Sequence, residues 1–125
     1  MTFAVWLRHW CALVFIWCSS WGSTPLAAEE LARSFAICAG RFEALATRQS
    51  ARQDPAAFGT RADYAEFALL LDAVAPLDTK EAVQWHAGGW VQVASLLARL
   101  DAGESAGTAG RLHTALETCR DLISF

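Results

Sequence analysis

The sequence predicts an all-α protein: a small antiparallel bundle of three to four helices, closed by one disulfide and preceded by a signal peptide. Apolar residues recur at every third or fourth position in four segments of the chain, which is the period of a helix with one buried face. No segment of useful length alternates apolar and polar residues as a half-buried strand does. The amino-terminal segment has the order of residues that is typical of export.

Residues 1–28 are predicted to be a cleavable signal peptide. Arg8 and His9 precede an apolar run over residues 10–18, and polar and small residues follow as far as Ala28. That run is shorter than the roughly 20 residues that a membrane-spanning helix needs. We expect cleavage after Ala28, which leaves residues 29–125 as one helical domain, periplasmic or secreted, without a stable membrane span. The alternative is an uncleaved anchor over residues 3–21, which Arg8 and His9 disfavour.

Charge and cysteine content bound the class of protein. Loss of Arg8 changes the formal net charge from −3 to −4, so we expect a protein partner and no nucleic acid, which needs a basic face.

Cys11 and Cys18 leave with the signal peptide. Cys38 and Cys119 remain, and an even pair in an exported chain indicates a disulfide, for which the chain-entropy model gives roughly 4–4.5 kcal/mol.

The first helix is predicted over residues 29–49. Its apolar residues are spaced 4, 3, 4 and 3 positions apart and share one stripe: Leu31, Phe35, Cys38, Phe42 and Leu45.

Inside this helix, the string FAICAGRFEAL covers residues 35–45. Ala39 and Gly40 make a thin spot where we expect the helix carrying Cys119 to approach. Arg41 is expected to reach acidic residues of another helix. The string resembles the start of the mature chain in short exported bacterial proteins of unknown role, which have a Phe-x-x-Cys-Ala-Gly-Arg-like motif. The resemblance implies export and a helical domain.

The second helix is predicted over residues 61–75. Asp54-Pro55 begins a short turn that Gly59 ends, and Thr60 with Asp63 resembles a capping box. Pro76 stops the helix. The expected inward residues are Tyr64, Phe67, Leu71 and Val74.

The third and fourth helices are predicted from capping residues and apolar spacing in the same way. Asp78 is the expected N-cap of the third helix, which ends near Ala102 with Gly103 as its C-terminal cap. The fourth helix is predicted over residues 108–123. The inward residues are Val83, His86, Trp90, Val93, Leu97 and Leu100 in the third, and Leu112, Leu116, Cys119 and Ile123 in the fourth.

The stretch QWHAGGW, residues 84–90, interrupts the third helix with two glycines that together cost about 2 kcal/mol of helix stability. Trp90 is expected to cover His86, while Gly89 leaves a notch beside Trp85. A neighbouring helix, or the connector over residues 50–60 with Phe58, fills this notch in the favoured interpretation. The alternatives are a small apolar ligand with His86 as its polar contact, and a break in the helix at Gly88-Gly89.

Motifs for catalysis, metals and cofactors are absent from the sequence. It contains no HExxH, CxxC or CxxCH, and no glycine-rich phosphate loop, so we expect no metal, no cofactor and no enzyme activity. His113 falls off the apolar stripe and is expected in solvent. The predicted function is a non-enzymatic exported helical protein, a protein-interaction or stress-related periplasmic factor. The alternative is a small apolar-ligand binding module that uses Trp85, His86, Gly89 and Trp90.

Intact-mass measurement of the exported protein checks the signal peptide and the disulfide together. We expect a chain that starts at Glu29 and is two hydrogen masses lighter than its reduced form. A mass that corresponds to the whole chain contradicts the predicted cleavage, and a mass that reduction leaves unchanged contradicts the disulfide.

Overall fold

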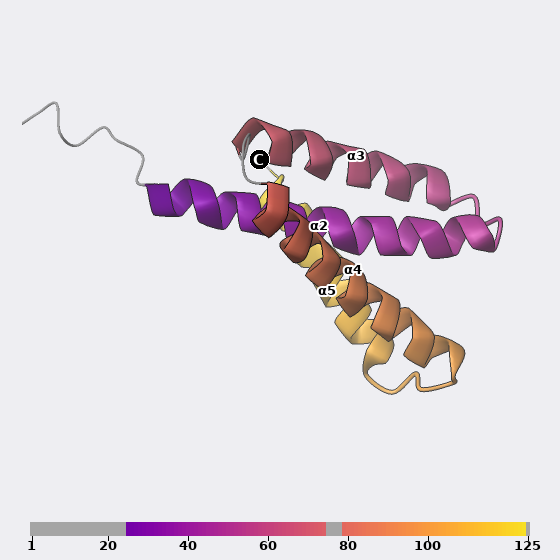
Figure 1. Ribbon diagram of the computed structural model, residues 1–125. Helices are drawn as coiled ribbons and strands as arrows, with labels where there is room; N and C mark the ends of the chain where they lie inside the picture. The colour runs from indigo at the N-terminus through magenta and orange to yellow at the C-terminus, as the bar shows by residue number, and fades with distance from the viewer. Residues whose placement is uncertain (1–24, 75–78, 125) are drawn as a thin grey trace, which may run out of the picture.

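The computed structural model describes residues 25–74 and 79–124, and these residues form four helices and no strands. The helices are α2 (Pro25–Ala51), α3 (Ala57–Val74), α4 (Thr79–Asp101) and α5 (Thr108–Leu122), as labelled in Figure 1. This confirms the all-α class. The expected signal peptide as far as residue 24, the stop at Pro76 and the N-cap at Asp78 lie outside the described residues.

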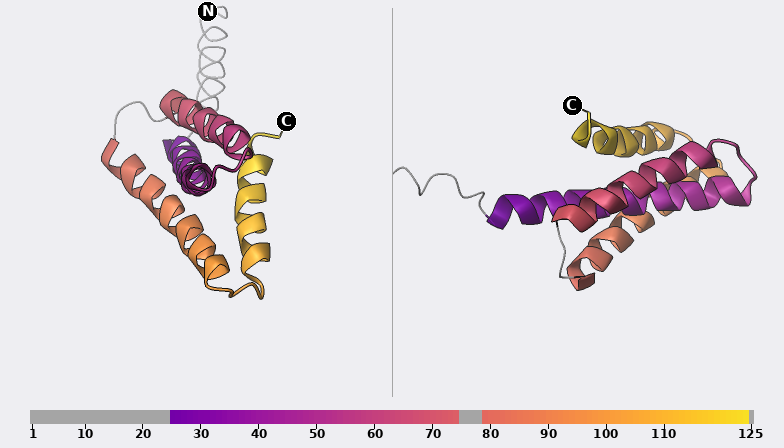
Figure 2. Two further views of the ribbon diagram at one scale, coloured as in Figure 1. Left: turned by 90° about the vertical axis from the view of Figure 1, so that its right-hand side faces the viewer. Right: turned by 90° about the horizontal axis from the view of Figure 1, so that it is seen from above.

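Helix α2 is the centre of the fold. It contacts each of the other three helices, and α4 also contacts α5. Helices α2 and α3 form an antiparallel hairpin, and the hairpin of α4 and α5 crosses it obliquely (Figure 1). Seen along α2, the other three helices surround it (Figure 2). The architecture is therefore a bundle of two crossed antiparallel hairpins around one central helix. None of the four helices has the length and hydropathy of a membrane span.

The central position of α2 explains why it buries more than the one stripe that the sequence predicts. The alanines at 32, 36, 39, 44 and 46 are all at most 5% exposed. Phe35, Cys38 and Phe42 of the predicted stripe are also buried. Leu31 is 41% exposed, because the amino-terminal end of α2 extends beyond the helices that cover it (Figure 1).

The aromatic core lies between α2 and α3. Phe42 and Phe67 are both 0% exposed, and their rings stack with centroids 5.5 Å apart. Phe35 packs on Phe67 with centroids 6.2 Å apart. Burial of each such side chain stabilises the fold by about 1.5–3 kcal/mol, so these three rings fix the α2–α3 hairpin.

The Cys38–Cys119 disulfide is present, as the sequence predicts. It joins α2 to α5 with the two Cα atoms 5.6 Å apart. Cys38 is 2% and Cys119 0% exposed, and both belong to the same core cluster as the three phenylalanine rings. The covalent link and the aromatic core therefore support one another.

Helices α2 and α4 cross at two glycines. A Cβ atom on Gly40 would lie 2.0 Å from the carbonyl oxygen of His86, and one on Gly89 would lie 2.1 Å from the carbonyl oxygen of Ile37. Only glycine fits at such a backbone contact. Helix α4 continues through Gly88 and Gly89, so the helix break that was left open does not occur.

This crossing corrects two predictions about which side chains face inward. Gly40 faces α4, whereas the thin spot was expected to admit the helix that carries Cys119. On α4 the inward face is Gly89, Val93 and Leu97, while Val83 is 65% and Trp90 39% exposed. The inner face is rotated because the closest contact forms at a glycine instead of at the largest apolar side chains.

Helix α3 begins at Ala57, earlier than the predicted residue 61, and includes Gly59. The carboxylate of Asp54 accepts a hydrogen bond from the backbone N–H of Ala56 at 2.9 Å, so Asp54 caps the start of this helix. Thr60, the predicted cap, is buried and donates its hydroxyl to the carbonyl of Ala56. The prediction failed because two capping signals stand close together and the earlier one is used.

The cap at the end of α4 is as predicted. Gly103 has a φ of +84°, in the left-handed region that favours glycine. Its backbone N–H donates to the carbonyl of Leu100, and that of Glu104 donates to the carbonyl of Arg99. These bonds end α4 and start the short connection to α5.

Substitution of the two neighbouring glycines in α4 tests the crossing. Gly89→Ala places a methyl group against the backbone of α2, and we expect the free energy of unfolding to fall by about 1–3 kcal/mol. Gly88→Ala is the matched control, because nothing lies within 4 Å of a Cβ there. It should raise stability by up to about 1 kcal/mol through helix propensity. Urea unfolding measures both, and a Gly89→Ala protein as stable as the wild type contradicts the crossing.

Candidate functional site

The two glycines of QWHAGGW lie in different environments. Gly89 is covered by the backbone of α2, whereas Gly88 is exposed. The space that was expected beside Gly89 is filled by α2, so a ligand there would have to separate two helices. Phe58, the other residue expected to fill the notch, is 85% exposed. Of the two expected candidates, the neighbouring helix therefore occupies the space.

His86 belongs to a polar cluster between α2, α3 and α4. Its Nε2 donates a hydrogen bond to the carboxylate of Glu43, and the two side chains are 29% and 40% exposed. The ring of Tyr64 meets the imidazole edge-on with centroids 6.2 Å apart. His86 was expected on the inward face of its helix, and it is hydrogen-bonded and half-buried there instead of enclosed in the core.

Burial and the charge of Glu43 both shift the pKa of Tyr64. Burial, and then the negative charge of Glu43, raise the pKa of the Tyr64 hydroxyl above its ordinary value, because both disfavour the phenolate. Among the described residues, no serine or threonine hydroxyl is hydrogen-bonded to His86. The cluster therefore ties three helices together.

The two tryptophans lie on different sides of α4. The guanidinium of Arg33 lies 5.7 Å from the ring centre of Trp85, within the range of a cation–π contact. Trp90 is 39% exposed beside Val91, which is 57% exposed. The tryptophans therefore do not share a pocket wall, and His113 is exposed as expected.

A separate groove lies between α4 and α5, with α2 at its base. Its volume is about 770 Å³, in the range of small-molecule and peptide sites. Arg41 comes from α2, Arg99 from α4 and Arg111 from α5, and we call this surface the arginine groove. None of the described residues that line it is acidic; its other polar side chains are Gln92, Ser95, Thr114 and Thr118.

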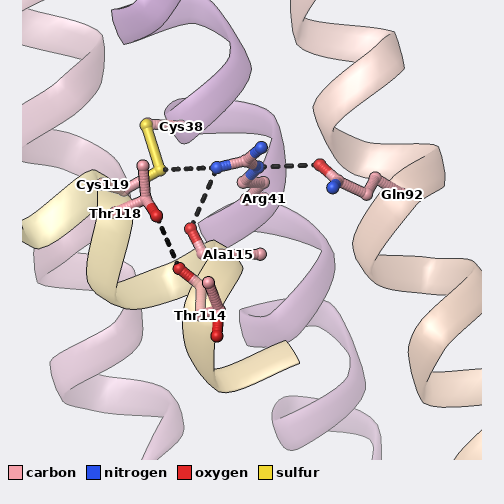
Figure 3. Close-up of a disulfide and its surroundings, with 7 residues drawn as sticks. All are labelled: Cys38, Arg41, Gln92, Thr114, Ala115, Thr118 and Cys119. Carbon is pink, nitrogen blue, oxygen red and sulfur yellow. Dashed lines mark hydrogen bonds between the residues drawn. A yellow bond between two sulfur atoms is a disulfide. The ribbon is translucent and has the colours of Figure 1, made fainter. Parts of the chain in front are cut away.

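Arg41 forms the base of the groove and spans both walls (Figure 3). Its Nε donates to the side-chain oxygen of Gln92 on α4, at 2.9 Å. Its Nη1 donates to the carbonyl of Ala115 on α5 at 2.9 Å, and to the sulfur of Cys119 at 3.4 Å. Neutral acceptors on two helices therefore hold the guanidinium in one orientation.

Arg41 was expected to reach acidic residues, and the structure contradicts this. The ion pairs among the described residues involve other cations, and no carboxylate pairs with Arg41. Burial lowers the pKa of its guanidinium, because the charged form loses hydration that no anion replaces. Arginine stays charged all the same, so the base of the groove presents a positive charge without a counter-ion.

The open end of the groove is also positive. Arg99 and Arg111 form no ion pair within the described part of the chain. Two nearby acids are engaged elsewhere: Asp101 pairs with Arg48 and Arg52, and Glu117 pairs with Arg120. The groove is therefore a cationic surface in a chain with more acidic than basic residues.

The arginine groove was missed at the level of sequence because its residues are scattered over positions 41–118. The one available signal was Arg41 beside the small residues of α2, and it was interpreted as an internal ion pair. Across residues 25–74 and 79–124, no three His, Cys, Asp or Glu side chains gather as a metal site. The groove's chemistry is therefore that of hydrogen-bond donors and positive charge.

Comparisons with protein-family models, curated proteins and solved structures give no match to this chain. The geometry of the groove and the cluster around His86 are thus the basis for inferring function.

Tyr64 is the only tyrosine, so its titration is directly observable. We expect the folded protein to ionise at a higher pH than the unfolded chain, whose tyrosine titrates near pH 10. Since the unfolded state loses its proton first, stability should fall as the pH rises past about 10. Ultraviolet absorbance of the phenolate measures the pKa. Glu43→Gln should lower it only in part, because burial is the larger cause; an unshifted pKa in the folded wild type contradicts this environment.

Proposed function

We propose that this chain is an exported, non-enzymatic helical protein, periplasmic or secreted, that acts by binding an acidic segment of another protein in the arginine groove. One observation carries the proposal: three arginines line the groove and no carboxylate does, in a chain with 13 acidic and 10 basic residues. Charge complementarity of this kind selects partners and speeds their association.

Two features support export. The disulfide between Cys38 and Cys119 is of the kind that persists in oxidising compartments, since cytosolic thiols are kept reduced. Residues 1–28 have the order of a signal peptide, and the string at residues 35–45 resembles that of short exported bacterial proteins. Both agree with a protein that meets its partner outside the cytosol.

The groove favours a protein segment over nucleic acid for reasons of charge and lining. Nucleic acids are bound by extended basic faces that neutralise many phosphates, and three arginines in one groove are a local feature. Leu96 and Ala115 add apolar surface, and Ser95, Thr114 and Thr118 add hydroxyl groups. This mixture suits a peptide, whose side chains and backbone combine apolar, hydrogen-bonding and charged contacts.

Site-specific photo-crosslinking in cells that export the protein tests the proposal. A photoreactive amino acid at Thr114, which lines the groove, should form an adduct with a discrete partner. The crosslinked peptide of that partner, identified by mass spectrometry, should be rich in Asp and Glu. The double variant Arg99→Gln/Arg111→Gln should reduce the adduct several-fold, because the outer positive charge is lost.

The matched control places the same photoreactive residue at Ala65, an exposed position of α3 that does not line the groove. An adduct that forms equally from both positions, or that is indifferent to the arginine substitutions, overturns the proposed function. Added salt should also weaken the genuine adduct, since screening acts over about 8–10 Å at physiological ionic strength.

A further inference from the structure

The positive charge of the arginine groove is divided between two positions along its length. The inner position is Arg41, whose guanidinium is fixed against Gln92 and Ala115 (Figure 3). The outer position is formed by Arg99 and Arg111, one on each wall. The stretch of groove between the two positions is lined by Ser95, Leu96 and Thr114, so no charged side chain fills it.

Helix geometry gives the separation of the two positions. On α4, Arg99 follows Gln92 by two helical turns, a rise of about 10 Å. On α5, Arg111 precedes Ala115 by about one turn, a rise of about 6 Å. Along the helix axes, Arg99 and Arg111 thus stand about 6–10 Å from the residues that hold the guanidinium of Arg41.

We infer that the acidic segment presents two carboxylates about 6–10 Å apart, one to Arg41 and one to Arg99 and Arg111; this rests on the proposed function. An extended chain rises about 3.3 Å per residue, so the two acidic residues stand two or three positions apart. Adjacent acidic residues fit poorly, because they stand only about 3.3 Å apart along an extended chain. The spacing of acids, and not their number alone, is then what the groove selects.

Arg41 is suited to the role of the inner contact because it is already oriented. Its hydrogen bonds to two helices remove side-chain freedom before the partner arrives, so less entropy is lost on binding. A carboxylate there would also replace part of the hydration that the partly buried guanidinium has lost.

Fluorescence anisotropy with labelled synthetic peptides tests the inference on the disulfide-bonded mature protein. The peptides share one length and a Ser/Thr-rich background and carry two glutamates one, two, three or eight positions apart. We expect spacings of two and three to bind at least about fivefold more tightly than the others. Arg41→Lys, which keeps the charge but loses the planar fork, and Arg111→Gln should each remove that preference.

Arg61→Gln is the matched control, because it removes one positive charge from α3, outside the groove, and should leave the preference intact. Equal binding of all spacings overturns the two-position inference and leaves the acidic partner in place. If no glutamate peptide binds the protein, both the inference and the proposed acidic partner are overturned, whether or not inorganic phosphate binds in the groove.

Discussion

The contact between the backbones of α2 and α4 at Gly40 and Gly89 is the constraint on which the rest of the structure depends. The carbonyl oxygen of His86 lies where a side chain on Gly40 would be, and that of Ile37 lies where a side chain on Gly89 would be. This contact sets both the crossing point and the rotation of α4 about its axis. Its consequence is an inner face of Gly89, Val93 and Leu97, with Val83 and Trp90 left at the surface.

The disulfide attaches α5 to another side of the same central helix. Helices α4 and α5 are therefore held apart where they meet α2 and come together only at their connecting loop (Figure 2). The groove is the space between these two fixed helices, and Arg41 of α2 lies at its base. A glycine contact on one side and a covalent bond on the other thus position the two walls of the groove.

The charge distribution connects this architecture to function. Asp101 and Glu117, two acids on α4 and α5, pair with arginines outside the groove. Arg41 instead satisfies its donors with neutral acceptors, which costs hydration without supplying a counter-charge. The acidic partner proposed for the groove would supply the counter-charge that the fold itself does not give to Arg41.

The sequence by itself determined the helical class, the inward stripe of α2 around Phe35, Cys38 and Phe42, the disulfide and the cap at Gly103. Each of these depends on the spacing of neighbours along one helix or on a single residue's chemistry. Only the tertiary structure decided that Gly40 meets the backbone of α4 and Gly89 that of α2, that α4 turns Trp90 outward, and that Arg41, Arg99 and Arg111 share one groove. A glycine in a helix indicates that another element can approach closely, but the sequence does not say which helix does so or how far the inward face then rotates. Local periodicity also does not register charges that meet only when three separate helices are packed together.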